Sequence, residues 1–68
     1  MMVSTIHELR EAKGLTQHQF ANRLGVGSGT ALGWERGTHR PTQRHLRQIA
    51  VVLGVAESTI MIVPARPL

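Results

Sequence analysis

The stretch that decides the fold is LTQHQFANRLGVGSGTALGWERG, residues 15–37. Thr16 stands before a segment with helical apolar spacing, and Gln19 completes the pattern of a capping box that closes a first helical turn. Gly25 is a suitable residue to end this helix, and the next helix is predicted over residues 28–36. Two short helices joined by a glycine-containing turn of three or four residues describe a helix-turn-helix.

Helical periodicity extends outward from this stretch, whereas signals for strands are nearly absent. We expect a first helix over about residues 3–13, a fourth over about residues 43–53 with Thr42 as its N-cap, and a short fifth over about residues 57–62. Proline prevents that last helix from continuing. The predicted fold class is all-α, a compact five-helix bundle that contains the helix-turn-helix.

Length and composition restrict the class of protein. The 68 residues make one domain, assigned to residues 1–63, followed by a C-terminal tail of residues 64–68. Eight Lys and Arg against four Asp and Glu give a formal charge of +4, which is typical of a nucleic-acid binder. An apolar run long enough to span a membrane is absent, and the charged N-terminal segment is unlike a signal peptide, so we expect a cytoplasmic protein.

Enzymatic and cofactor chemistry have little support in the sequence. In GVGSGT, residues 25–30, a dinucleotide fingerprint would need glycine where Thr30 stands, and a Walker loop would need a lysine. The four histidines lack metal-ligand spacing, and the chain holds no cysteine. Ser28 has no histidine or acid close to it in sequence that would make it a nucleophile. We therefore expect no enzyme, no cofactor and no metal.

Several short matches give the chain a family resemblance. They are LTQ at 15–17, FA at 20–21, LGV at 24–26, WERG at 34–37, RPT at 40–42 and LGV at 53–55. With these matches, which span about residues 5–62, the chain resembles the Xre family, the DNA-binding domains of lambda-type phage repressors and their bacterial relatives. The resemblance implies a DNA-binding transcriptional regulator, most simply a repressor, that is encoded by a bacterium or phage and associated with the nucleoid. It also implies a lambda-repressor-like fold that binds double-stranded DNA as a homodimer, with the third helix in the major groove.

The resemblance also assigns positions at the DNA. It places Gln17 against a phosphate, Ser28, Gly29, Leu32 and Gly33 at base-contacting positions, and Thr38, His39 and Arg40 in a phosphate-gripping loop. It further pairs Arg10 with Glu35 as a structural ion pair. Independently, a spacing of 100° per residue turns Ala31 and Trp34 inward and Gly29, Leu32, Gly33 and Arg36 outward.

Gly29 and Gly33 lack the side-chain donors and acceptors that base recognition needs. In one interpretation, a thin helix approaches the DNA closely and recognises its shape. In a second, base contacts come from Ser28, Thr30, Leu32 and Arg36. In a third, the surface binds protein. Gly33→Ala is expected to stabilise the fold and to alter DNA binding.

Two further features have alternative interpretations. Arg36, Arg40, Arg44 and Arg47 form either a solvated face or a phosphate clamp. The apolar residues 60–63 either complete the core or, with the tail, form a two-fold dimer interface. The alternative to a DNA-binding regulator is a protein-interaction module, such as the antitoxin that binds a toxin.

Overall fold

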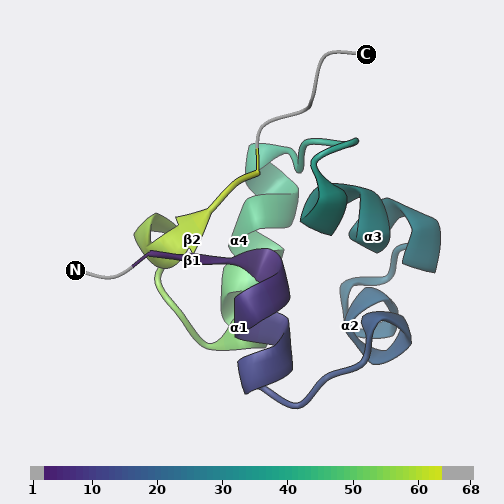
Figure 1. Ribbon diagram of the computed structural model, residues 1–68, viewed down its shortest axis with the longest axis horizontal. Helices are drawn as coiled ribbons and strands as arrows, with labels where there is room; N and C mark the ends of the chain where they lie inside the picture. Colours follow the sequence, from purple (N-terminus) through teal and green to yellow (C-terminus); the bar gives the residue numbers. More distant parts are fainter. Residues whose placement is uncertain (1–2, 64–68) are drawn as a thin grey trace.

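The computed structural model describes residues 3–63 and is mostly helical. In chain order its elements are β1 (Ser4–Thr5), α1 (Ile6–Ala12), α2 (Gln17–Leu24), α3 (Ser28–Arg36), α4 (Gln43–Leu53), the 3₁₀ turn η1 (Glu57–Thr59) and β2 (Ile60–Met61). In Figure 1 the strand pair and the α2–α3 unit lie at opposite sides, with α1 and α4 between them. None of the helices in residues 3–63 has the length and apolarity needed to cross a membrane.

Local capping explains where the helices begin. The capping box predicted at α2 is confirmed, because the Thr16 hydroxyl accepts from the Gln19 amide and the Gln19 side chain accepts from the Thr16 amide. A second capping box joins Thr5 to Glu8 at the start of α1. Hydrogen bonds from the Thr5 backbone amide and hydroxyl to the Glu8 carboxylate lower the pKa of Glu8. α3 begins after Gly27, which provides no side-chain cap.

The core lies where the inner faces of the four α-helices meet. Phe20 of α2 and Ile49 of α4 are fully enclosed, and Trp34 of α3 is 3% exposed. The buried apolar residues are Ile6, Leu15, Phe20, Ala21, Leu24, Ala31, Trp34, Ile49, Ala50, Leu53 and Ile60. Helical spacing in the sequence therefore identified Ala31 and Trp34 correctly as inward-facing residues of α3.

The predicted fifth helix is wrong, and so is the expectation that strands are absent. After η1 the chain becomes extended, and β2 pairs in parallel with β1, with Ser4 opposite Ile60 and Thr5 opposite Met61. Residues 59–63 are rich in β-branched side chains, which favour extended backbone over helix. The pairing also holds Ser4–Thr5 out of α1, so that helix begins at Ile6 rather than near Val3. The predicted tail, residues 64–68, lies outside the described residues.

Candidate nucleic-acid interface

α2 and α3 form the predicted helix-turn-helix. Gly25 ends α2 with a φ of 70°, and the next amide, that of Val26, returns to the Ala21 carbonyl. This left-handed conformation is one that glycine adopts without strain and that closes a helix end. Ala31 and Trp34 then face inward from α3 and are buried, as predicted. The side of α3 opposite Ala31 and Trp34 faces away from the core and forms part of the molecular surface.

The outer surface of α3 begins with three exposed residues, Ser28, Gly29 and Thr30. Leu32 is half-buried, and Arg36 at the end of the helix is exposed. The start of α2 adjoins this surface, because the His18 ring lies 3.3 Å from the Ser28 hydroxyl, from Nδ1 to Oγ. Gln17, the residue before His18, is half-buried. The structure therefore brings the N-terminal turns of both helices together.

Gly33 lies on the outward stripe of α3, as predicted, but it is buried rather than exposed. The loop after α3 folds back over it, and the Gly33 carbonyl accepts from the backbone amides of Gly37, Thr38 and His39 at 2.9, 3.0 and 3.2 Å. A methyl group at Gly33 would overlap the imidazole of His39, with its carbon 2.9 Å from the ring Cγ. The gain in helix propensity expected from Gly33→Ala is therefore opposed by displacement of this ring. Helical spacing alone could not show this, since it describes the helix without the loop.

Thr38, His39 and Arg40 are themselves exposed, in the loop between α3 and α4. The Thr38 hydroxyl lies 3.4 Å from the Gly33 carbonyl oxygen and 3.3 Å from Nδ1 of His39. These contacts tie the loop to the C-terminal half of α3. The loop and the outer surface of α3 are consequently parts of one continuous face.

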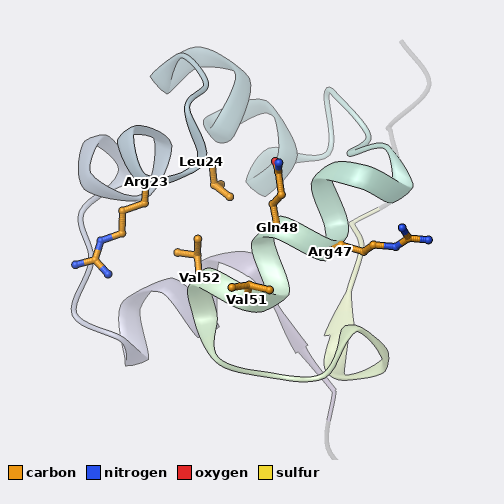
Figure 2. Close-up of a pocket in the computed structure, with 6 residues that line it drawn as sticks. All are labelled: Arg23, Leu24, Arg47, Gln48, Val51 and Val52. Carbon is orange, nitrogen blue, oxygen red and sulfur yellow. The ribbon is translucent and has the colours of Figure 1, made fainter.

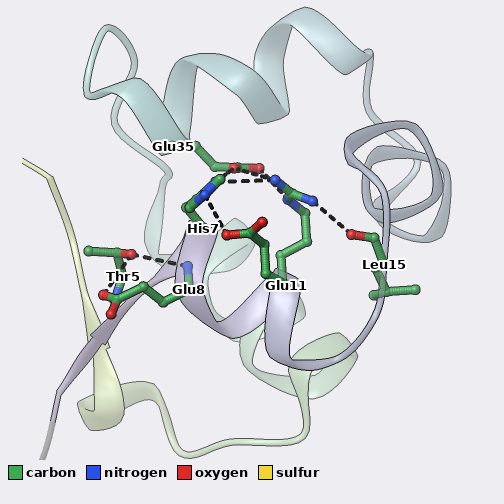
Figure 3. A network of polar contacts seen from close by, with 7 residues as sticks. Thr5, His7, Glu8, Glu11, Leu15 and Glu35 are labelled. Carbon is green, nitrogen blue, oxygen red and sulfur yellow. Dashed lines mark hydrogen bonds and ion pairs between the residues drawn. The ribbon is translucent and has the colours of Figure 1, made fainter.

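Arg10 and Glu35 form an ion pair that fixes α3 against α1 (Figure 3). The guanidinium donates from Nε and Nη2 to the two carboxylate oxygens at 3.0 and 3.1 Å, and from Nη1 to the Leu15 carbonyl at 2.7 Å. The side chains are 9% and 3% exposed. His7 extends the network, with Nδ1 2.9 Å from Glu35 and Nε2 2.7 Å from Glu11. One buried arginine thus joins α1, the turn before α2 and the end of α3.

The distribution of charge favours an anionic ligand at the α3 side of the molecule. From residue 12 to residue 56 the sole carboxylate is Glu35, which is buried against Arg10, whereas the same segment holds six of the eight Lys and Arg. Arg36 and Arg40 are exposed, and no carboxylate within residues 3–63 pairs with either. An anion that approaches α3 and its following loop therefore meets cations without competing acids.

Arg47 belongs to a different surface. Its Nε lies 3.8 Å from Glu57, and it lines an open groove of about 340 Å³ between α2 and α4, together with Arg23 and the apolar Val51 (Figure 2). Arg23 comes five residues after His18 in α2, which places the two side chains about 140° apart around the helix at 100° per residue. Arg47, one of the four arginines considered together in the sequence, therefore lines this groove, and the exposed Arg36 and Arg40 are the candidates for a phosphate clamp.

Sequence reasoning missed two contacts at this site. Nothing in the local pattern indicated that His39 would cover Gly33, because the contact depends on how the loop returns. The contact between His18 and Ser28 could have been suspected from the sequence, because His18 lies in the first turn of α2, next to Gln17.

Within residues 3–63 no group of three His, Asp or Glu side chains could hold a metal ion.

Comparison with known proteins gives two matches. A family model described as helix-turn-helix matches residues 6–60, from the start of α1 into β2. The cryptic phage CTXphi transcriptional repressor RstR of Vibrio cholerae is 38% identical over 55 residues, which cover 81% of this chain and 50% of that protein. The chain thus spans about half the length of this curated relative. No solved structure matches the chain.

Proposed function

The chain belongs to the Xre-type helix-turn-helix family, and we propose that it represses transcription by binding duplex DNA as a dimer, with α3 in the major groove. The family match and the similarity to a phage repressor both support the broader class, a DNA-binding transcriptional regulator. Repression would follow from occupation of an operator that polymerase must use. No observation on residues 3–63 favours the protein-interaction alternative over DNA binding.

The observation that carries the proposal is the exposed, acid-free face formed by α3 and its following loop. A helix of nine residues supported by Ala31 and Trp34 presents Ser28 and Thr30 outward, and Arg36 ends it. The major groove admits an α-helix, and base edges are distinguished there by hydrogen bonds and apolar contacts. Ser28, Thr30 and Arg36 supply hydrogen-bonding groups, and Leu32 supplies an apolar surface for a thymine methyl.

Phosphate contacts would come from both sides of α3. On one side stands Gln17 in the first turn of α2, where free backbone amides and the helix dipole favour an anion. On the other side stand Thr38, His39 and Arg40 of the loop. Arginine suits this position because its planar guanidinium matches the oxygens of a phosphate. Such contacts set the position of a protein on the duplex but carry no sequence information directly.

Dimerisation would place two copies of α3 in half-sites about one helical turn apart. We propose the strand-pair side of the molecule as the dimer surface, because Val3 and Met61 are 53% and 46% exposed there. Ile60 is excluded from this surface, since it is buried in the core. Sedimentation of the protein at tens of micromolar tests this part of the proposal, and a monomer at every concentration would contradict it.

Selection of bound sites from a random duplex pool, followed by affinity measurements over a range of salt, tests the main proposal. The logarithm of the binding constant is expected to fall with the logarithm of salt by about 0.9 per phosphate contacted. Arg36→Ala and Arg40→Ala should each weaken binding. Where the lost contact is to phosphate, each should reduce that slope by about 1 per subunit, and so by about 2 for the dimer.

Arg23→Ala is the matched control, because it removes an equal charge from the groove between α2 and α4. It should bind as the unmodified protein does, apart from the small effect of net charge. Equal losses in all three variants would indicate nonspecific attraction to a basic protein. Unchanged affinity in Arg36→Ala and Arg40→Ala would remove the basis for placing DNA on the α3 face.

A further inference from the structure

The imidazole of His39 occupies the space in which a side chain at position 33 would begin. The carbon of a methyl group built on Gly33 would lie 2.9 Å from Cγ and 3.1 Å from Cε1 of His39, and would overlap Nδ1. Carbon atoms in contact normally lie about 3.5–4.0 Å apart. The ring and a side chain at residue 33 are therefore mutually exclusive in this arrangement.

Residue 33 lies on the stripe of α3 that faces outward. Gly29 stands four residues before it and Arg36 three residues after it, and both are exposed. Residues with this spacing are neighbours on one face of a helix. A side chain on residue 33 would thus project between these two positions, and the His39 ring projects there in its place.

The loop is held so that the ring stays over the helix. Three backbone amides of residues 37–39 converge on the Gly33 carbonyl, and the Thr38 hydroxyl adds a contact to that oxygen. Nδ1 of His39 faces this hydroxyl at 3.3 Å. Among residues 3–63 the hydrogen bonds of the ring involve Nδ1 alone, so Nε2 is available to a ligand.

We propose that His39 acts as the base-contacting side chain of position 33, delivered to the outer face of α3 from the loop rather than from the helix. This inference rests on the proposed binding of α3 in the major groove. It changes the role of His39 from a phosphate contact to a contact with a base edge, through Nε2. It also gives Gly33 a purpose, which is to leave room for the ring.

The test compares His39→Ala, Gly33→Ala and Gly29→Ala for binding to the selected site and to its single-base variants. A good bidentate side-chain contact to a base edge discriminates against the wrong base by about 5- to 150-fold, so the single contact through Nε2 should give a preference near the lower end of that range. His39→Ala should abolish such a preference at one base pair of each half-site and leave the salt slope unchanged. Gly33→Ala should reduce the same preference, because its methyl group displaces the ring.

Gly29→Ala is the matched control, since the space around Gly29 is open and no ring moves. It adds the same methyl group to the DNA-facing side of α3 and is therefore allowed to change overall affinity, but it should keep the relative preference at the base pair that His39 contacts, because the ring stays in place. His39→Ala alters an exposed side chain, so its result stands even where Gly33→Ala lowers stability. An NMR contact between the His39 ring and the Gly33 α-protons, present in the unmodified protein and lost in Gly33→Ala, checks the displacement itself.

The possible outcomes distinguish a failure of the role proposed for His39 from a failure of the proposed DNA binding. Retention of every base preference by His39→Ala would overturn the inference alone. A uniform loss of affinity across all base variants would do the same, because it would mark His39 as a phosphate contact. Failure of the unmodified protein to select any site would overturn sequence-specific binding, and the inference with it.

Discussion

Removal of Arg10 should destabilise this domain more than the loss of a surface ion pair would. The guanidinium binds both oxygens of Glu35 and the Leu15 carbonyl, and the carboxylate is 3% exposed. Arg10→Met keeps a long apolar side chain but leaves the Glu35 charge buried with His7 as its remaining contact. It also removes the donor to the Leu15 carbonyl. The variant therefore tests a buried charge deprived of its main partner.

The expected loss is about 3–5 kcal/mol of unfolding free energy, the usual result of removing one partner from a buried pair. A domain of this size has a total stability of roughly 3–10 kcal/mol, so the variant would approach the limit of folding. The melting temperature should fall by about 12 °C or more, at roughly 4–8 °C per kcal/mol. Arg10→Met combined with Glu35→Leu should recover much of this loss, because both charges are then absent.

Urea denaturation followed by Trp34 fluorescence measures these differences, since Trp34 is buried in the core. Arg47→Met is the control, because Arg47 is 72% exposed and lies 3.8 Å from Glu57. It should change stability by less than about 1 kcal/mol. A comparably small effect of Arg10→Met, or a double variant no more stable than Arg10→Met, would refute the account of a buried, mutually dependent pair.

Two further predictions concern α1 and α3. The Thr5 amide and hydroxyl donate to the Glu8 carboxylate and lower the pKa of Glu8. The stability that these hydrogen bonds add is complete above the unfolded-state pKa, near 4.5, and is lost as pH falls through the lower folded-state pKa. An NMR titration of Glu8 should show the low pKa, and Thr5→Ala should raise it in part, because the variant loses the hydroxyl donor and keeps the amide donor. An identical titration in both proteins would show that the hydroxyl does not contribute. Gly29→Ala should raise stability by about 0.5 kcal/mol in urea denaturation, since the site is open and alanine favours helix. A loss of stability would mean that Gly29 has a structural role.

Local signals in the sequence were sufficient for most of the fold. Thr16, Gly25 and Thr42 mark helix ends through hydrogen bonds and backbone angles that involve only near neighbours in the chain. Helical spacing identified Ala31 and Trp34 as inward residues of α3, because they lie on the stripe that the core covers. The sequence could also suggest Arg10 and Glu35 as partners through family resemblance, although 25 residues separate them.

Contacts between distant segments account for what the sequence did not predict. β2 exists because Ile60 and Met61 meet Ser4 and Thr5, more than fifty residues earlier, and helical spacing over residues 57–62 contains no trace of that pairing. The burial of Gly33 has a similar origin on a smaller scale. It depends on the path of the loop, which is set by the amides that converge on the Gly33 carbonyl.

Helical spacing places Gly29 and Gly33 on the same face of α3, but the structure gives the two glycines different physical explanations. Each glycine in a helix interior lowers stability by up to about 1 kcal/mol relative to alanine. At Gly33 the close approach of His39 opposes that gain, because alanine would displace the ring. At Gly29 the surroundings are open, and the fold gains nothing from the missing side chain. The interpretation of α3 as a helix thinned for close approach to DNA consequently depends on Gly29, whereas Gly33 is explained by the ring that replaces its side chain.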